Sequence, residues 1–308
     1  MSTSEWFPTG EQVDLVRDGV SAVVTEVGAT IRRLVVSGVD VVEGFEADEI
    51  PKSSQGAILV PWPNRVRDGK WQHEGQTLQL DISEPKFGNA SHGLLRNTGY
   101  AVERLAADRV VLRAPVHPTR GYPFSLATEV EYALTDDGLA VTHRITNRGR
   151  DAAPVGIGAH PYFRIGDVPT TELTLRTTAA TIITVDERSN PTGTAPVPPE
   201  KDLRPGPRVG DITLDDAFTD LEPVGGRVEH VITAPDRSTV TVWADESFAW
   251  VQAFTSTTLR PGRIALAVEP MTMPANAFNS GDGLTWLSPG DTLTCQWGIS
   301  VHIEEQQG

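Results

Sequence analysis

The chain has 308 residues, and its 41 acidic and 26 basic side chains give a formal net charge of −15. This acidic balance, without any block of Lys and Arg, disfavours nucleic acid and anionic membrane surfaces as partners. Cys295 is the only cysteine, which excludes an intramolecular disulfide and a zinc site built from cysteines. The first 15 residues lack a basic region followed by an apolar one, and no run of 18 apolar residues occurs, so we expect a soluble, cytoplasmic protein.

Strand signals dominate from the beginning of the chain. Residues 20–44 are rich in β-branched side chains punctuated by glycine. Residues 128–147 and 230–245 each contain two alternating segments around a turn, which predicts antiparallel hairpins. Residues 291–303 alternate strictly and predict a half-buried strand with Cys295 facing the core. No helical apolar period persists beyond two turns, so the chain is predicted to be all-β, as a sandwich or barrel.

We expect one domain over residues 1–308, because all-β architectures often exceed 200 residues as single units. The segment 186–211 contains six prolines and almost no apolar periodicity, which predicts a long loop. Alternating strands resume on both sides of it without a shift in composition. The pattern therefore favours an excursion within the domain, and it leaves open whether this loop closes over a binding cleft.

Two titratable residues stand directly before a proline: His160 in "GIGAHPYFRIG" and Glu269 in "AVEPMTMPANAFNSG". A residue before proline is kept out of helical geometry, and proline has no N–H for a sheet ladder. We therefore expect both side chains at strand ends or edges, lining a cleft. Apolar neighbours raise the pKa of a carboxyl group such as that of Glu269. With a histidine, such a group forms an acid/base pair, and a purely structural histidine is the alternative.

Hydrogen-bonding side chains cluster in residues 57–71, "AILVPWPNRVRDGKW". Asn64 and Arg65 follow two prolines and lie between Trp62 and Trp71. Amide and guanidinium donors beside aromatic rings suit a polyhydroxylated ligand, because sugar hydroxyls take directed hydrogen bonds and sugar C–H faces pack on rings. An ion pair at the surface is the alternative for Arg65.

Residues 87–97 place His92 beside Gly93, where another group can approach the backbone closely. Asp215 and Asp216 can each accept a sugar hydroxyl proton. The histidines and carboxylates lack the H-x-H or H-x-x-x-H spacing of metal sites, so no metal is predicted. No nucleophile elbow or phosphate loop is present either.

Together these motifs resemble those of the aldose 1-epimerases, the galactose-mutarotase-like proteins. The segments "LVPWPNRVRDGKW", "ASHGLLRN", "GAHPYF", "LDDAFTDL" and "AVEPMTMPANAFNSGDGL" occur in the family's order within residues 57–299. The resemblance implies a large antiparallel β-sandwich, the supersandwich, with a cleft on one sheet. It also implies that Glu269 is the general base and His160 the general acid. They would interconvert the α and β anomers of a hexose or modified hexose by ring opening, without cofactor or metal.

The resemblance further implies sugar contacts at three motif positions: Arg65, His92 and Asp215. Asp215 matches the family's D-x-x-F pattern because Phe218 lies three residues later, and Asp216 is a close rival. Asn64, next to Arg65, is a further candidate for substrate binding. The short "FGNASHG" replaces the N-x-x-N-x-L-H-G pattern of galactose-active members, which argues against a preference for galactose.

Two other functions fit the same motifs. A hexose-6-phosphate 1-epimerase needs a cationic pocket, for which four basic residues near the motifs are candidates: Arg67, Lys70, Arg96 and Arg164. A non-catalytic sugar-binding module would not need both proton carriers. In each case the expected partner is a small sugar molecule, and the protein is expected to be a monomer or homodimer. Five histidines in predicted hairpins, turns or polar strand faces receive no role: His73, His117, His143, His230 and His302.

Overall fold

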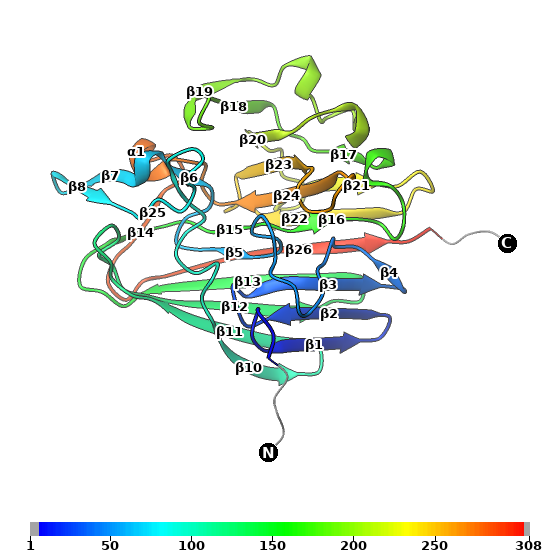
Figure 1. The fold of residues 1–308 in the computed structure, drawn as a ribbon, viewed down its shortest axis with the longest axis horizontal. Helices are drawn as coiled ribbons and strands as arrows, with labels where there is room; N and C mark the ends of the chain where they lie inside the picture. The colour runs from blue at the N-terminus through cyan, green and yellow to red at the C-terminus, as the bar shows by residue number, and fades with distance from the viewer. Residues whose placement is uncertain (1–5, 305–308) are drawn as a thin grey trace.

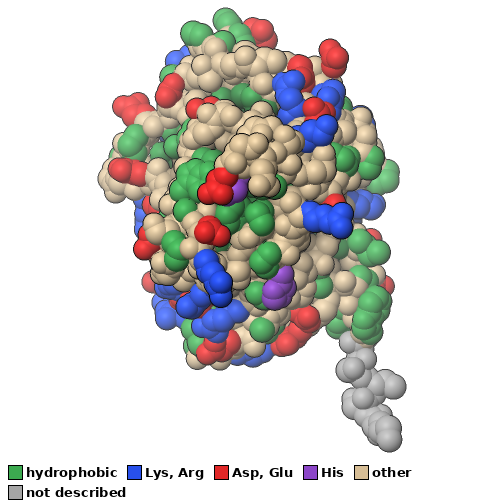
Figure 2. Space-filling model, turned by 90° about the vertical axis from the view of Figure 1, so that its left-hand side faces the viewer, with side chains coloured by type: hydrophobic (Ala, Val, Ile, Leu, Met, Phe, Trp, Pro, Cys, Tyr) green, Lys and Arg blue, Asp and Glu red, His purple; other side chains and the backbone are tan. Residues whose placement is uncertain are grey.

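The computed structural model describes residues 6–304, which form an almost entirely β structure (Figure 1). The single α-helix among these residues is α1 (Ala277–Ser280), and four 3-10 turns accompany it. The all-β prediction is therefore confirmed. Among residues 6–304 there is no helix with the length and apolar composition of a membrane span. On the face shown in Figure 2, acidic and basic side chains are interspersed without a continuous basic band.

One layer of the molecule is an eight-stranded antiparallel sheet, which we call the continuous sheet. Its strands are, in spatial order, β10 (Ala101–Ala106), β11 (Arg109–Val116), β12 (Leu126–Leu134), β13 (Gly138–Asn147), β26 (Thr292–His302), β22 (Thr239–Asp245), β21 (Arg227–Thr233) and β17 (Thr174–Arg176). Both predicted hairpins are present, as β12–β13 and β21–β22. In β26, Cys295 and alternate residues after it are buried, as the period of two predicts.

The second layer contains another eight-stranded sheet, which we call the interrupted sheet. Its strands are β19 (Pro191–Pro196), β18 (Thr181–Val185), β20 (Asp215–Thr219), β23 (Trp250–Ser256), β24 (Ala265–Met271), β15 (Gly158–Ala159) and β5 (Ile58–Leu59), with β16 (Tyr162–Phe163) also beside β24. An N-terminal sheet of β1 (Gln12–Arg17), β2 (Val20–Thr25), β3 (Thr30–Val36) and β4 (Val39–Asp40) packs over β11–β13 (Figure 1). Three short ribbons complete the fold: β6 (Arg65–Val66) with β9 (Ala90–Ser91), β7 (Lys70–His73) with β8 (Gln76–Gln79), and β14 (Ala153–Val155) with β25 (Thr285–Leu287).

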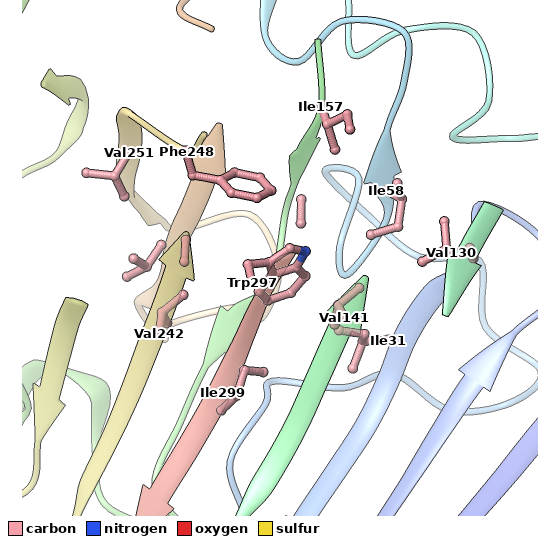
Figure 3. Packing of buried hydrophobic residues seen from close by; sticks show 14 of the residues in the cluster. Ile31, Ile58, Val130, Val141, Ile157, Val242, Phe248, Val251, Trp297 and Ile299 are labelled. Atoms are coloured by element: carbon pink, nitrogen blue, oxygen red, sulfur yellow. The ribbon is translucent and has the colours of Figure 1, made fainter. Parts of the chain in front are cut away.

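The core lies between these layers. Trp297 of β26 points from the continuous sheet towards Phe248, Val251 and Ile157 of the other layer (Figure 3). Trp297 and Phe248 are almost completely buried, and each such apolar side chain contributes roughly 1.5–3 kcal/mol. Two sheets whose apolar faces meet in this way form a sandwich, as predicted.

The segment 186–211 differs from the predicted loop. It contains β19, which pairs with β18, and two 3-10 turns, η3 (Pro199–Lys201) and η4 (Val209–Asp211). Pro191 and Pro196 occupy the two ends of β19, the outermost strand of its sheet. An edge strand tolerates proline because one side of it has no neighbouring strand with which to form hydrogen bonds. The segment lacks apolar periodicity, so its sequence did not indicate a strand.

Candidate functional site

A cavity of about 410 Å³ opens on the interrupted sheet, and we call it the β24 cavity. All six residues that the sequence nominated for catalysis or sugar binding line it: Asn64, Arg65, His92, His160, Asp215 and Glu269. They come from separate stretches of the chain, carried by β6, β20, β24 and the connections around β9, β15 and β16. A volume of this size lies within the range of small-molecule sites.

His160 and Glu269 face each other because β15 and β16 pair with β24 in the same register, with a gap between these two short strands. Gly158 pairs with Met271 before the gap, and Tyr162 pairs with Ala267 after it. The same register places His160 directly opposite Glu269, and opposite residues in a sheet have Cβ atoms roughly 4.5–5.5 Å apart. The Nε2 atom of His160 lies 3.3 Å from Oε1 of Glu269.

The gap has a local cause in the backbone of His160. Its N–H donates to the carbonyl of Ala57, and its carbonyl accepts from the N–H of Gly56. Pro161 and Pro270 each lack an N–H for a ladder, so neither can close the gap. His160 thus lies at a strand break, as predicted. Glu269 does not lie at a strand end: it is inside β24 and pairs with Gln252 of β23, so that expectation was wrong.

Burial sets the protonation of this pair. Burial raises the pKa of Glu269 well above its usual value, the nearby Asp215 raises it further, and Arg65 opposes the shift. Burial lowers the pKa of His160 to about 4, and Arg96 acts in the same direction. Each shift disfavours the charged form of its own group, so burial favours a shared proton between His160 and Glu269 over an isolated carboxylate or imidazolium. That proton can reside on either partner across the 3.3 Å contact.

The ring of His160 is held from two sides. It stacks on Tyr162 with 5.0 Å between ring centroids, and it meets His92 edge to face at 5.5 Å. Its Nδ1 atom is buried and has no hydrogen-bond partner within residues 6–304. The stacked ring fixes the direction in which Nε2 points, towards Glu269 and the cavity.

His92 is a neutral hydrogen-bond donor. Its Nδ1 accepts the backbone N–H of Asn64 at 3.2 Å, so its own proton resides on Nε2. Burial lowers the pKa of His92 well below its usual value, and His160 is the next largest cause. Gly93 has a positive φ and packs against the carbonyl of Val60 without room for a Cβ atom. The close approach expected at this glycine is therefore made by the protein's own backbone.

Arg65 is both paired and exposed to the cavity. Its guanidinium donates to both carboxylate oxygens of Glu84, at 2.8 and 3.0 Å. This bidentate ion pair is the alternative considered for Arg65, and it orients the guanidinium without removing it from the β24 cavity. Oδ1 of Asn64 accepts the backbone N–H of Arg65 at 2.8 Å, which holds Asn64 in a left-handed conformation.

Gln252 is a cavity residue that sequence reasoning missed. Its Nε2 donates to Asp215 at 2.8 Å, and its Oε1 accepts from Nδ2 of Asn64 at 3.3 Å. It is buried and lies opposite Glu269 across β23 and β24. A lone amide within the apolar run "AWVQAF" was the signal that could have identified it.

The two adjacent aspartates have different surroundings. Asp215 lines the cavity, whereas Asp216 turns away to bind Nζ of Lys201 at 2.6 Å. Successive side chains of a strand point to opposite faces, so only one of the pair can face the cavity. Of the two candidates, Asp215 is the one that the fold brings to Glu269.

The aromatic residues of the cavity are not the predicted ones. Trp62 and Trp71 are almost fully buried and pack against Phe278 of α1, so they cannot contact a ligand in the β24 cavity. Phe87 and Phe254 line the cavity instead. Trp62 and Trp71 belong to the core because helix α1 covers them, a contact that only the fold brings about.

Of the four basic residues considered for a phosphate pocket, one reaches the cavity. Arg96 lines it, whereas Arg67 pairs with Asp186 and Lys70 is exposed on β7. Arg164 pairs with Asp167 and lines a separate hollow. The described residues contain no cluster of three or more histidine, cysteine or carboxylate side chains suited to a metal ion.

Comparisons with known proteins agree on one family. The family model of aldose 1-epimerases matches residues 11–300. The chain is 35% identical to the uncharacterised protein YihR of Escherichia coli K12 over 294 residues, which are 94% of this chain and 93% of YihR. Over 134 residues it is 30% identical to a second uncharacterised E. coli K12 protein, YphB, covering 40% of this chain and 45% of YphB.

Solved structures share the fold at lower identity. The GalM/aldose epimerase homologue of Caenorhabditis elegans superposes with a TM-score of 0.83 at 18% identity, covering 96% of this chain and 99% of that one. The galactose 1-epimerase of Lactobacillus acidophilus gives a TM-score of 0.79 at 19% identity, covering 94% of each chain. These structures have the same β-sandwich as this chain.

Proposed function

This chain belongs to the aldose 1-epimerase family, and we propose that it interconverts the α and β anomers of a hexose or modified hexose. One observation carries the proposal. His160, between β15 and β16, lies opposite Glu269 of β24 with 3.3 Å between Nε2 and Oε1, and both line the β24 cavity. Two proton carriers this close can serve the two oxygens bonded to one anomeric carbon, O1 and the ring oxygen O5.

The reaction needs a base at one oxygen and an acid at the other. Glu269 takes the proton from the O1 hydroxyl while His160 gives its proton to O5, so the C1–O5 bond breaks and O1 becomes the aldehyde oxygen. Rotation about C1–C2 exposes the other face of the aldehyde. His160 then takes the proton back from O5, Glu269 returns one to O1, and the ring closes as the other anomer. At the end of the reaction His160 and Glu269 again hold one proton between them.

The sugar selects the productive form of the pair. Burial by itself favours a neutral Glu269 and a neutral His160. O1–H is a donor and O5 an acceptor, so a bound pyranose stabilises the carboxylate and the imidazolium instead. Moving one proton over 3.3 Å converts the first form into the second.

Other cavity residues orient the ring through its hydroxyls. His92 donates from Nε2, the neighbouring Asn64 and Arg65 also donate, and Asp215 accepts. Gln252 couples Asn64 to Asp215, so these groups are held as one hydrogen-bonded row. Phe87 and Phe254 offer apolar contact to the C–H faces of the ring.

The test is anomer exchange followed by NMR or polarimetry with the Glu269→Gln variant. Gln has the same shape but cannot take a proton, so exchange should fall by about 10²–10⁴. Retained sugar binding in this variant, measured by calorimetry, shows that the site is intact. Exchange at the wild-type rate would overturn the mechanism, and a wild-type protein that binds sugar without accelerating exchange would be a binding module.

The same variant reports on stability. Folded Glu269 has a raised pKa, so its contribution to stability is present below about pH 4.5 and is lost as the pH rises through the folded value. Glutamine does not ionise, so the variant does not lose stability in this way as the pH rises. The Glu269→Gln protein should therefore have a Tm at neutral pH at least equal to that of the wild type, which separates lost chemistry from lost structure.

A further inference from the structure

Part of the proline-rich segment 186–211 lies beside a wall of the β24 cavity, and the proposed mechanism does not use it. This part is the turn of residues 186–190 between β18 and β19 (Figure 1). Oδ1 of Asp186 accepts the backbone N–H groups of Arg188 and Asn190, each at 2.9 Å, as aspartates do in tight turns. The turn is thus closed by its own hydrogen bonds, and it holds the backbone of Arg188 in a defined place.

Arg188 binds a second loop, residues 84–89, which we call the Phe87 loop. The Nε atom of Arg188 donates to the carbonyl of Phe87 at 2.7 Å. Its Nη2 atom donates to Oδ1 of Asp68 at 2.6 Å, so one guanidinium joins two segments. The buried Asn89 donates from Nδ2 to the carbonyl of Arg188 at 3.2 Å. Hydrogen bonds therefore run in both directions between the turn and the Phe87 loop.

The Phe87 loop forms one wall of the β24 cavity. Its residues Glu84, Lys86 and Phe87 line the cavity. Glu84 orients Arg65 through the bidentate ion pair, and the ring centroid of Phe87 lies 5.3 Å from the guanidinium carbon of Arg65. The loop thus carries cavity groups on its side chains, while its backbone accepts the contact from Arg188. A displacement of this backbone would move all of these groups together.

A second arginine docks the turn from the β6 side. The Nη2 atom of Arg67 lies 3.1 Å from Oδ2 of Asp186 and donates to the carbonyl of Pro191 at 3.3 Å. The backbone N–H of Arg67 in turn donates to Oδ1 of Asn276 at 3.1 Å. A lid that opened at this turn would have to break the contacts of both Arg67 and Arg188. The arrangement is that of a docked support.

We propose that Arg188 is a positioning residue, which holds the Phe87 loop in the conformation that binds the sugar, and that the turn 186–190 is a fixed support of the cavity wall. The inference rests on the proposed function in taking the β24 cavity as the sugar site. A wall that is already in place does not have to be ordered when the ligand binds, so preorganisation increases affinity. His160 and Glu269 lie on other segments, so loss of Arg188 affects binding more than proton transfer.

Steady-state anomer exchange on the full chain, measured by NMR with glucose, galactose and mannose, tests this role. Arg188→Gln should raise KM about three- to tenfold and change kcat by less than about twofold. Arg188→Lys restores the charge without the planar fork and should recover part of the loss. Arg204→Gln removes an arginine from the same segment, where its partner is Asp202, and should leave KM unchanged.

Trypsin reports on the Phe87 loop without any ligand. Lys86 is exposed in this loop, and cleavage after it in the native protein requires the loop to open locally. Arg188→Gln should accelerate this cleavage about three- to tenfold, whereas Arg204→Gln should not change it. Mass spectrometry of the fragments identifies the cleaved bond.

A double-mutant cycle tests whether Arg188 acts through this loop. Phe87→Leu removes the ring from the cavity wall and should raise KM by itself. In that background Arg188→Gln should raise KM further by less than about twofold, because the group that it positions is already missing. Equal increases in both backgrounds would contradict the assignment.

The outcomes separate this inference from the proposed function. Unchanged cleavage after Lys86, or faster cleavage with an unchanged KM, would overturn the inference and leave the proposed function standing. Calorimetry provides the converse case. A wild-type protein that binds one of the three sugars without exchange, and binds it more weakly as Arg188→Gln, would keep the inference and reject the proposed function.

Discussion

The two eight-stranded sheets each bury histidine, yet only one of them builds a site. In the continuous sheet the ladders of β12, β13 and β26 run unbroken, and His143 points into the core, where Nε2 accepts from the indole N–H of Trp297 at 3.0 Å. In the interrupted sheet the ladder beside β24 breaks at His160. At this break the ladder hydrogen bonds are missing and space is left beside β24. The buried imidazole of His160 therefore reaches the β24 cavity and the carboxyl group of Glu269.

A lowered pKa does not distinguish these histidines. Burial lowers the pKa of His143 to about 3 and that of His230 to about 4, close to the value of His160. His230 is bound to the hydroxyl of Thr177. His143 and His230 lie in two of the predicted hairpins, β12–β13 and β21–β22, and both side chains are buried. A perturbed pKa identifies a functional group only together with a cavity and an opposing partner.

Exchanging one histidine in each sheet for asparagine is the strongest test of this contrast. His160→Asn should slow anomer exchange by about 10²–10⁴ because the proton donor to O5 is lost. His143→Asn should leave exchange by the folded protein unchanged but lower the free energy of unfolding by about 1–3 kcal/mol, because the buried indole of Trp297 loses its acceptor. Denaturant unfolding and NMR exchange measure the two effects. Equal loss of exchange in both variants would contradict the division between the sheets.

A smaller effect is expected from a matched pair of glutamines. Gln252→Met breaks the row from Asn64 to Asp215 and should raise the KM for sugar about tenfold, with a smaller change in kcat. Gln296→Met makes the same change in β26, where the side chain bonds to Thr142, and should leave both constants unaltered. Steady-state exchange kinetics separate KM from kcat. An unchanged KM in Gln252→Met would mean that the row does not hold the ligand.

The smallest expected effect is a shift in the pH profile of exchange. The pair needs one proton, so kcat/KM should fall below about pH 4, where His160 takes a second proton, and again above the raised pKa of Glu269, where the pair loses its only one. Asp215 contributes to that raised pKa, so Asp215→Asn should move the alkaline limb of kcat/KM to lower pH by roughly one unit or less. Asp216→Asn, which loses a contact with Lys201, is the control. An alkaline limb that stays in place in Asp215→Asn would remove Asp215 as a cause.

Much of the fold was open to prediction from local pattern. The hairpins β12–β13 and β21–β22 and the buried face of β26 follow from alternation and turn residues, which act over a few positions. The predictions that were wrong also rested on local pattern. Edge strand β19 has no apolar period, and Trp62 and Trp71 were assigned to a ligand because nothing near them in sequence reveals the cover from α1.

By itself the sequence determined which chemical groups are available: the two residues before proline, the neighbouring asparagine and arginine, and the histidine beside a glycine. It also determined the all-β class, since period-two patterning can be satisfied only in sheets. Only the tertiary structure decided that His160 stands opposite Glu269, that Gln252 joins Asn64 to Asp215, and that Asp216 turns away. The physical reason is that register between strands far apart in sequence depends on the whole sheet, and register sets which side chains share a face.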